Sequence, residues 1–245
     1  MFAPDVISLR QFYATPRGED ARAMIACALR ELWPAANGDV ALGIGYAAPY
    51  LESYLTQASP AMICMPSQQG AAYWPPSAPN LVFLAHESLL PLPDNSINRI
   101  LLMHSVEHSE QLSGMMDEAW RVLTPGGRLL AIVPNRLGFW ARSSRSPFGY
   151  GRPFSLTQLR DLMTGHHFTL TRRTSALFMP PSRLLWRLAP RIEKLGKAFC
   201  PFFGGVLLVE GEKQVYAAVR QPVKARKSYT LPIPAAEPAL RMDRR

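Results

Sequence analysis

The sequence predicts an α/β fold in which parallel strands are connected by helices. Short apolar runs, which indicate buried strands, alternate with segments whose apolar residues recur every three or four positions, as on one face of a helix. The predicted strands are residues 40–44, 61–65, 81–85, 99–103 and 128–133. The predicted helices are residues 17–33, 49–57 and 109–122. This alternation is typical of a parallel sheet with right-handed crossovers.

Two stretches depart from this pattern. Residues 66–80 are rich in proline, glycine and serine, so we expect a loop rather than a crossover helix between the second and third strands. The C-terminal part has two longer β-rich segments, residues 168–178 and 206–219, separated by a helix at 182–199 that Pro190 divides. We predict one domain over residues 1–221, followed by a basic, proline-containing disordered tail at 222–245.

Composition limits the class of protein. The chain has 245 residues, of which 48 % are hydrophobic and 18 % charged, as expected for a globular protein with a sizeable core. The net charge of +9 favours anionic partners, although a basic surface also serves solubility alone. No apolar run reaches the length of a membrane-spanning helix, and residues 1–10 lack a signal-peptide core, so we expect a cytoplasmic protein.

The three cysteines are far apart in the sequence and form no CxxC motif. We expect Cys27, Cys64 and Cys200 to be buried thiols in a reducing compartment, with neither a disulfide framework nor a metal site.

A glycine-containing turn follows the first predicted strand. Gly43 and Gly45 are small residues at the point where a sheet of this kind binds nucleotide-type ligands, and the next helix offers its N-terminus there. A tight turn without any ligand would explain the same two glycines.

Two longer segments are more specific. Residues 90–108, LPLPDNSINRILLMHSVEH, and residues 118–130, EAWRVLTPGGRLL, closely resemble the segments around the fourth and fifth strands of the type-11 group of class I S-adenosylmethionine-dependent methyltransferases. The resemblance extends over roughly residues 20–220. It implies a Rossmann-like, mostly parallel sheet of seven strands in the order 3-2-1-4-5-7-6, with the last strand antiparallel and helices on both faces.

The resemblance also implies S-adenosylmethionine as methyl donor, bound at the C-terminal ends of the first four strands. The implied donor contacts are Gly43, Gly45, Tyr46, Ala47, Met65, His86, Glu87, Ser88 and His104. Three acidic residues that the family usually has are replaced here by Gly43, Met65 and His86. Carboxylates make strong charge-assisted hydrogen bonds, so Glu52, Glu87 or Ser88 would have to substitute for them. The alternative is an inactive methyltransferase-like binding or regulatory protein.

Methyl transfer needs mainly the alignment of an activated methyl group with its acceptor, so a catalytic dyad is not required. His104 and His108 lie near the end of the fourth strand, and we predict His104 as a general base for an oxygen or nitrogen acceptor. His108 resembles a family position that is usually structural.

The segment after the fifth strand combines arginines with aromatic residues. Residues 119–160 contain seven arginines and no acidic residue. We predict a small or medium anionic substrate that contacts Arg136, Trp140, Arg142 and Arg152. A lid or a surface that faces a protein partner is the alternative, and an RNA methyltransferase ranks third because no nucleic-acid-binding module accompanies the arginines. Ser155 and Gln158 then predict the capped start of a helix.

Overall fold

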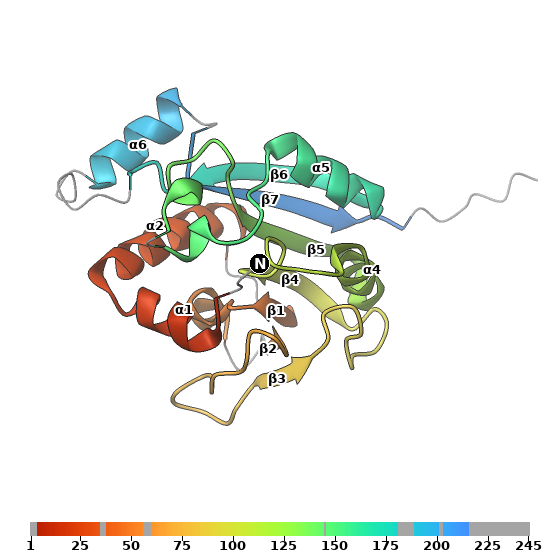
Figure 1. The fold of residues 1–245 in the computed structure, drawn as a ribbon. Coiled ribbons are helices and arrows are strands. Elements are labelled where there is room, and N and C mark those ends of the chain that lie inside the picture. Colours follow the sequence, from red (N-terminus) through yellow and green to blue (C-terminus); the bar gives the residue numbers. More distant parts are fainter. Residues whose placement is uncertain are drawn as a thin grey trace, which may run out of the picture. The chain divides into compact units, whose positions relative to one another are not determined.

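A sheet of seven strands forms the centre of the structure (Figure 1). Its order is β3-β2-β1-β4-β5-β7-β6, which confirms the predicted order. Strands β1 to β5 are parallel to one another, and β7 is antiparallel to both β5 and β6. The strands are β1 Ala41–Gly45, β2 Ala61–Pro66, β3 Val82–Ala85, β4 Ile97–Met103, β5 Leu123–Pro134, β6 Phe168–Ala176 and β7 Val206–Lys213.

The computed structural model describes residues 4–34, 38–55, 60–144, 146–180, 189–200 and 203–215. They belong to one compact unit, Met1–Val215. The predicted tail at 222–245 and the predicted domain end at residue 221 lie outside the described residues, as do residues 182–188 of the predicted C-terminal helix.

Helices cover both faces of the sheet, as expected. The helices are α1 Val6–Tyr13, α2 Pro16–Leu32, α3 Ala48–Leu51, α4 Leu112–Val122, α5 Leu156–Gly165 and α6 Ala189–Phe199. Figure 1 shows α1 and α2 on one side of the sheet and α4 and α5 on the other. Successive strand residues point to opposite faces, so Leu101 and Met103 pack in the core beneath α2, whereas Leu102 packs in a second core beneath α4. No helix in the described ranges is long and apolar enough to cross a membrane.

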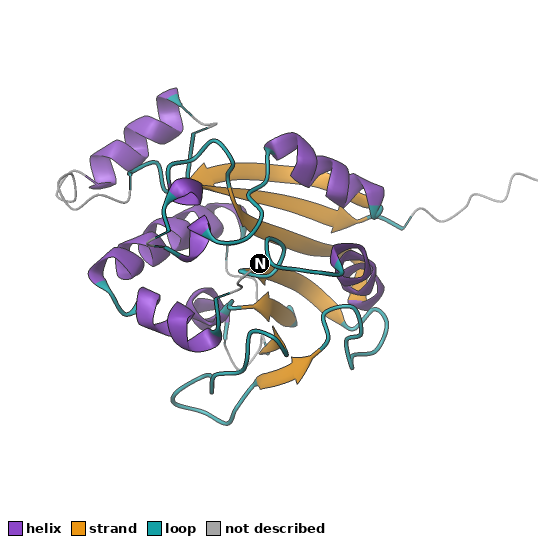
Figure 2. Cartoon of the chain, in the orientation of Figure 1, coloured by secondary structure: helices purple, strands orange, loops and turns teal. Residues whose placement is uncertain are grey.

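Local signals explain where several helices begin. Asp5 accepts a hydrogen bond from the backbone N–H of Ser8 at 2.7 Å and starts α1, a helix that the sequence analysis did not predict. Ser155 and Gln158 form the predicted capping box of α5. Figure 2 shows residues 67–81, between β2 and β3, as loop, which confirms that the crossover helix is absent there.

Some predicted bounds need correction. The strand predicted at residues 128–133 is longer, since β5 begins at Leu123 and its pairing with β4 continues past a register shift between Ile97 and Arg99. The helix predicted at residues 109–122 begins at Leu112, and the helix predicted at 49–57 is the short α3 followed by a 3-10 turn, Glu52–Tyr54.

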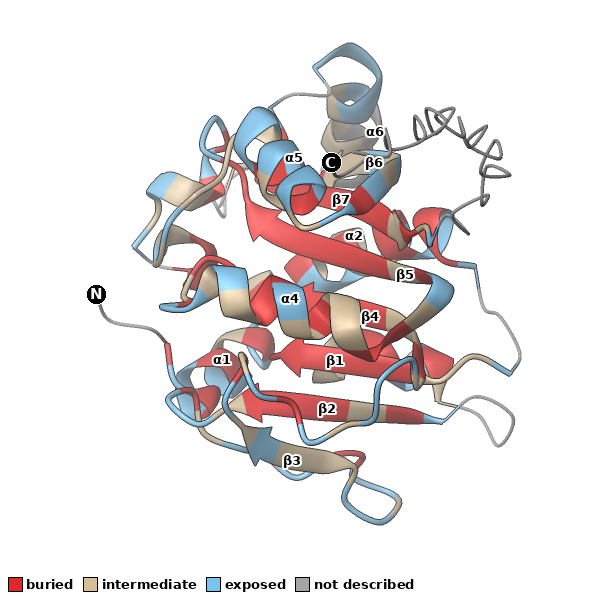
Figure 3. Ribbon diagram, turned by 90° about the vertical axis from the view of Figure 1, so that its right-hand side faces the viewer, coloured by how far each residue is buried: buried red, intermediate tan, exposed pale blue. Residues whose placement is uncertain are grey.

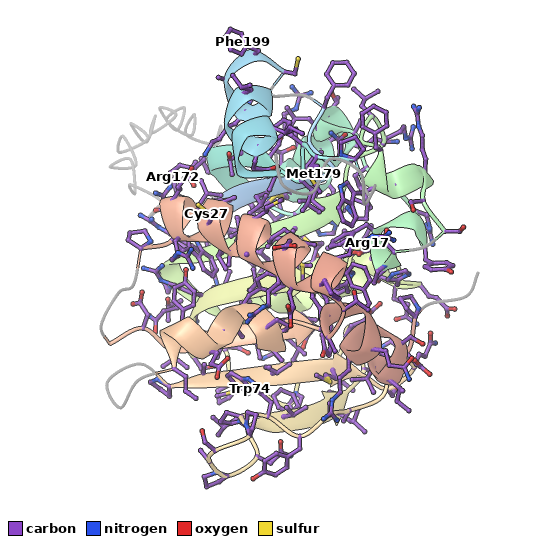
Figure 4. All side chains as sticks on the ribbon, turned by 90° about the vertical axis from the view of Figure 1, so that its left-hand side faces the viewer. Arg17, Cys27, Trp74, Arg172, Met179 and Phe199 are labelled. Atoms are coloured by element: carbon purple, nitrogen blue, oxygen red, sulfur yellow. The ribbon has the colours of Figure 1, made fainter. Side chains whose placement is uncertain are left out.

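The prediction of three buried cysteines is wrong for two of them. Cys64 in β2 is buried, whereas Cys27 and Cys200 are exposed. Cys27 lies on the outer side of α2, where Figure 4 labels it, because Ala21, Ile25 and Ala28 occupy the buried side of that helix. Burial raises the pKa of the Cys64 thiol to about 12.

Two buried charged residues of β7, Glu210 and Lys213, form hydrogen bonds with neighbouring segments. The Glu210 carboxylate accepts hydrogen bonds from Trp33 Nε1 at 2.6 Å, from Thr171 Oγ1 at 2.5 Å and from the Arg172 guanidinium at 3.1 Å. Lys213 Nζ donates to Asn95 Oδ1 at 2.9 Å and to two backbone carbonyl oxygens in the α4–β5 connection, each at 2.7 Å. Each charge therefore stabilises the packing of β7 against segments distant in the sequence.

Candidate functional site

The ends of β1 and β4 meet closely at Gly45. The residue pairs with Met103 and has a φ of +85°, a conformation that favours glycine. A Cβ atom at Gly45 would lie 2.3 Å from the carbonyl oxygen of Met103, and one at Gly43 would lie 2.5 Å from Cβ of Ala47. Close packing alone therefore accounts for both glycines of the predicted donor turn.

A pocket opens beside this turn, at the C-terminal ends of β2, β3 and β4. In Figure 3 the arrowheads of β1 and β2 point toward this edge and toward α1. The lining residues are Pro66, Ser67, Gln68, Gln69, His86, Glu87, His104, Ser105, His108, Glu110 and Gln111. Three predicted donor contacts, His86, Glu87 and His104, line the pocket.

The other predicted donor contacts do not line the pocket. Gly43, Gly45, Tyr46, Ala47 and Met65 are all buried in the protein. Ser88 lies at the rim, where its hydroxyl group is 2.8 Å from His86 Nδ1 and donates to Gln111 Oε1 at 2.9 Å. Glu52, the other suggested substitute for a missing acid, is exposed and does not line this pocket.

Unsatisfied polar atoms gather around this pocket. Gln69 Oε1, Ser105 Oγ and His108 Nε2 line it, are buried and have no hydrogen-bond partner. Glu107 Oε2, from the same turn as His108, is also buried without a partner. Most buried polar atoms in proteins are paired, so four unpaired atoms in one place indicate a site for a polar ligand.

His104 connects the pocket to a buried chain of hydrogen bonds. Its Nδ1 is 3.2 Å from Glu107 Oε1, its Nε2 is 2.9 Å from the Tyr13 hydroxyl group, and Tyr50 donates to that hydroxyl group at 3.1 Å. His104 has a φ of +52°, unusual for a residue other than glycine, and its carbonyl oxygen accepts from Gln69 Nε2 at 3.0 Å. Such strained residues are often found at functional sites.

The surroundings determine the protonation of this chain. Burial acts to raise the pKa of Glu107, but the hydrogen bond from His104 and the two nearby imidazoles outweigh it and hold the pKa below its usual value. An ionised carboxylate only accepts hydrogen bonds, so Nδ1 of His104 carries the proton; in the neutral imidazole Nε2 then accepts from the Tyr13 hydroxyl group. Burial raises the pKa of Tyr13 well above its usual value, so Tyr13 stays a neutral phenol.

His104, Glu107 and His108 also offer metal-ligand atoms within 4.8 Å of one another. Both nitrogens of His104 are already engaged with Glu107 and Tyr13. We therefore interpret the group as a hydrogen-bonded relay.

The four predicted substrate residues are not brought together. Arg152 lies beside the site, since its backbone N–H donates to the Glu107 carbonyl oxygen at 2.9 Å. Arg136 and Arg142 are exposed, and Trp140 is buried with its indole N–H bonded to the Met179 carbonyl oxygen at 2.7 Å. Trp140 thus belongs to the core of its loop and does not line the pocket.

Sequence reasoning missed several residues of this site. Tyr13 was missed because no helix was expected before residue 17, although Val6, Leu9 and Tyr13 have the spacing of a helix face. Gln69 lies in a loop without any periodic signal, and its position depends on the fold of that loop.

A family model described as a methyltransferase domain matches residues 38–131, which span β1 to β5. Residues 38–131 thus match the methyltransferase family that the sequence resembles. The match begins before the glycine turn and includes both motif segments, so the resemblance noted in the sequence is confirmed.

The methyltransferase domain also resembles individual proteins. A probable S-adenosylmethionine-dependent methyltransferase of Mycolicibacterium smegmatis is 40% identical over 50 residues, which are 20% of this chain and 20% of that protein. The chain therefore matches about a fifth of the length of that relative. A crystal structure of an S-adenosylmethionine-dependent methyltransferase from Thermotoga maritima superposes with a TM-score of 0.62 at 17% identity, over 85% of this chain and 96% of that one.

A second solved structure contains ligands. The Burkholderia thailandensis 1,6-didemethyltoxoflavin-N1-methyltransferase, with bound 1,6-didemethyltoxoflavin and S-adenosylhomocysteine, superposes with a TM-score of 0.55 at 16% identity. The similarity covers 86% of this chain and 85% of that one. At such identities the likeness establishes the fold.

Proposed function

We propose that this chain is an S-adenosylmethionine-dependent methyltransferase and that it binds the donor in the pocket at the ends of β2, β3 and β4. The observation that carries the proposal is the set of buried, unpaired atoms there, namely Gln69 Oε1, Ser105 Oγ and His108 Nε2. In open α/β sheets, ligands bind outside the C-terminal ends of the strands, which is where these atoms lie.

The residues present fit the nucleoside part of the donor. Its adenine amine and ribose hydroxyl groups need acceptors, which Gln69 Oε1 and the Glu87 carboxylate supply, and Ser105 adds a hydroxyl group. Glu87 thereby substitutes for an acidic residue that the family has elsewhere. When bound, the donor supplies a methyl group already activated as a sulfonium.

His104 is the proposed base. It lines the pocket, Glu107 holds its Nδ1, and its Nε2 can accept a proton once the Tyr13 hydroxyl group, 2.9 Å away, has moved aside. In this role Nε2 takes the proton from the acceptor group as that group becomes a nucleophile. Glu107 stabilises the imidazolium that results.

The acceptor was expected to be anionic. Of the three arginines predicted to bind it, Arg152 is the one whose backbone contacts the relay, and its guanidinium lies 3.4 Å from the Ser109 carbonyl oxygen. An anionic acceptor therefore remains a prediction that depends mainly on Arg152. Cytoplasmic location and a protein partner remain predictions as well.

Calorimetry with S-adenosylmethionine and S-adenosylhomocysteine tests the donor site. We expect both to bind, and Glu87→Gln to weaken binding about 10- to 100-fold, the range for a hydrogen bond to a charged group. Glu212→Gln, a half-buried acid in β7 that does not line the pocket, is the matched control and should bind like the wild type.

Absence of binding at millimolar ligand would refute the enzyme and leave an inactive, methyltransferase-like binding protein. An RNA-directed activity would instead require RNA affinity that falls steeply with salt.

A further inference from the structure

Tyr13 is held in the structure as a bound aromatic ligand would be. Its ring stacks on Tyr46 with 5.7 Å between ring centroids and an interplanar angle of 21°. The rings of Tyr50 and His104 meet it edge-on at 6.1 Å and 5.9 Å. These three residues, which we call the aromatic box, come from the ends of β1 and β4 and from α3, whereas Tyr13 is the last residue of α1. The Tyr13 ring therefore comes from a different element than the three residues that surround it.

The box recognises the hydroxyl group as well as the ring. Tyr13 donates to His104 Nε2 and accepts from Tyr50. A phenol can do both at one oxygen, whereas an aromatic amine nitrogen is a poor acceptor and a carboxylate has no proton to donate. Burial raises the pKa of Tyr46 and of Tyr13, so the box disfavours anions.

His104 belongs both to the proposed donor pocket and to the aromatic box. It lines the proposed donor pocket, and its Nε2 is directed to the Tyr13 hydroxyl group in the box. A ligand hydroxyl group at the position of the Tyr13 hydroxyl would therefore meet the proposed base at the edge of the donor pocket.

On the basis of the proposed function, we infer that the methyl acceptor is a hydroxylated aromatic ring, a phenol, which takes the place that Tyr13 holds in the aromatic box. The phenol oxygen forms its bond to the methyl carbon as the sulfur–carbon bond of the donor breaks. His104 Nε2 takes the hydroxyl proton and later releases it to solvent, so charge and atoms balance. The sheet stays in place, whereas the C-terminal turn of α1 has to move together with the start of α2, whose Gly18 packs against the backbone of Phe12 and Tyr13.

Binding of 4-methylphenol, measured by calorimetry, tests this inference without relying on turnover. We expect Tyr13→Ala, which empties the box, to bind 4-methylphenol at least 10-fold more tightly than the wild type. Toluene should bind that variant about 25-fold more weakly than 4-methylphenol, because it forms neither of the two hydrogen bonds, each worth about 5-fold. Tyr54→Ala is the matched control, because Tyr54 is equally buried and hydrogen-bonded to the Trp33 carbonyl oxygen, away from His104.

Tyr13→Phe serves as a second variant if Tyr13→Ala does not fold. It keeps the ring and removes only the hydroxyl group with its two hydrogen bonds, so we expect 4-methylphenol to bind about 25-fold more tightly than to the wild type. Equal binding of toluene and 4-methylphenol, or no gain in either Tyr13 variant, would overturn the inference.

Saturation with S-adenosylhomocysteine separates this inference from the proposed function. An acceptor site should bind 4-methylphenol at least as tightly when the donor product is present, and the wild type with S-adenosylmethionine should yield 4-methylanisole. Competition between 4-methylphenol and S-adenosylhomocysteine would show that Tyr13 occupies the place of the donor, and would overturn the acceptor assignment but keep the donor site. If S-adenosylhomocysteine does not bind, the proposed function fails by itself, and the acceptor assignment fails with it.

Discussion

Replacement of Gly45 by alanine should reveal how tightly the ends of β1 and β4 are joined. The new Cβ would lie 2.3 Å from the Met103 carbonyl oxygen and 3.0 Å from Cβ of Ser105. The same carbonyl oxygen accepts a hydrogen bond from the backbone of Tyr46 at 2.8 Å, so it cannot move without losing that bond. Gly126 is the matched control, because its φ of +77° is similar and no atom lies within 4 Å of its Cβ position.

Both substitutions place a side chain on a backbone in the left-handed conformation, and only Gly45→Ala also overpacks its surroundings. A left-handed conformation with a side chain costs about 1–2 kcal/mol, and the reduced freedom of the unfolded chain returns about 0.4–1 kcal/mol. Gly126→Ala should therefore destabilise by about 1 kcal/mol. Gly45→Ala adds overpacking of about 1–3 kcal/mol and the loss of a hydrogen bond of about 1 kcal/mol, which brings its total to about 3–5 kcal/mol.

Urea unfolding followed by circular dichroism measures both free energies of unfolding. If Gly45→Ala falls within about 1 kcal/mol of Gly126→Ala, the strand ends separate at little cost, and close packing is not the reason for glycine at position 45.

Three further outcomes are expected. Ellman's reagent should react quickly with Cys27 and Cys200 in the folded protein and with Cys64 only after unfolding, because burial raises the pKa of Cys64 to about 12; three fast thiols would contradict this. Burial acts to raise the pKa of Glu210, but its hydrogen bonds outweigh burial and keep the pKa below its usual value. The ionised Glu210 therefore stabilises the fold above its unfolded pKa of about 4.3, and this stabilisation is lost as the pH falls through the folded pKa. In Glu210→Gln the free energy of unfolding should depend less on pH in the acid range, and equal slopes for wild type and variant would refute this. Lys213→Met should lower the free energy of unfolding in urea by about 2–4 kcal/mol, because three acceptors, one of them buried, lose their donor; a change under about 1 kcal/mol would argue against that role.

The sheet could be predicted because its signals are local. Each strand is a short apolar run, and the motif segments at residues 90–108 and 118–130 identify the fourth and fifth strands and hence the family order. The loop at 67–81 was also predictable, since its prolines and glycines disfavour a helix. Bounds were less predictable at β5, where only the pairing with β4 shows that the strand begins at Leu123.

The site was predictable only in part, because its geometry depends on contacts between distant segments. His86, Glu87 and His104 follow strand ends, so chain order is sufficient to place them at the pocket. Tyr13 approaches His104 across 91 positions of the sequence, and no local pattern encodes that contact. Trp140 was wrongly predicted to contact the substrate, because an aromatic residue among arginines resembles a binding residue. Its indole ring is instead buried in the core, and its N–H donates to the Met179 carbonyl oxygen.

The position of β7 has a consequence for synthesis of the chain on the ribosome. Residues 206–213 fill the space between β5 and β6, so β6 emerges first but has no strand neighbour until β7 follows. During that interval the edge of β5 that later pairs with β7, Arg128–Pro134, offers unpaired backbone groups, a template for association with other chains. Nascent chains stalled before residue 206 should therefore recruit chaperones or aggregate, whereas chains released beyond residue 213 can close the sheet on themselves.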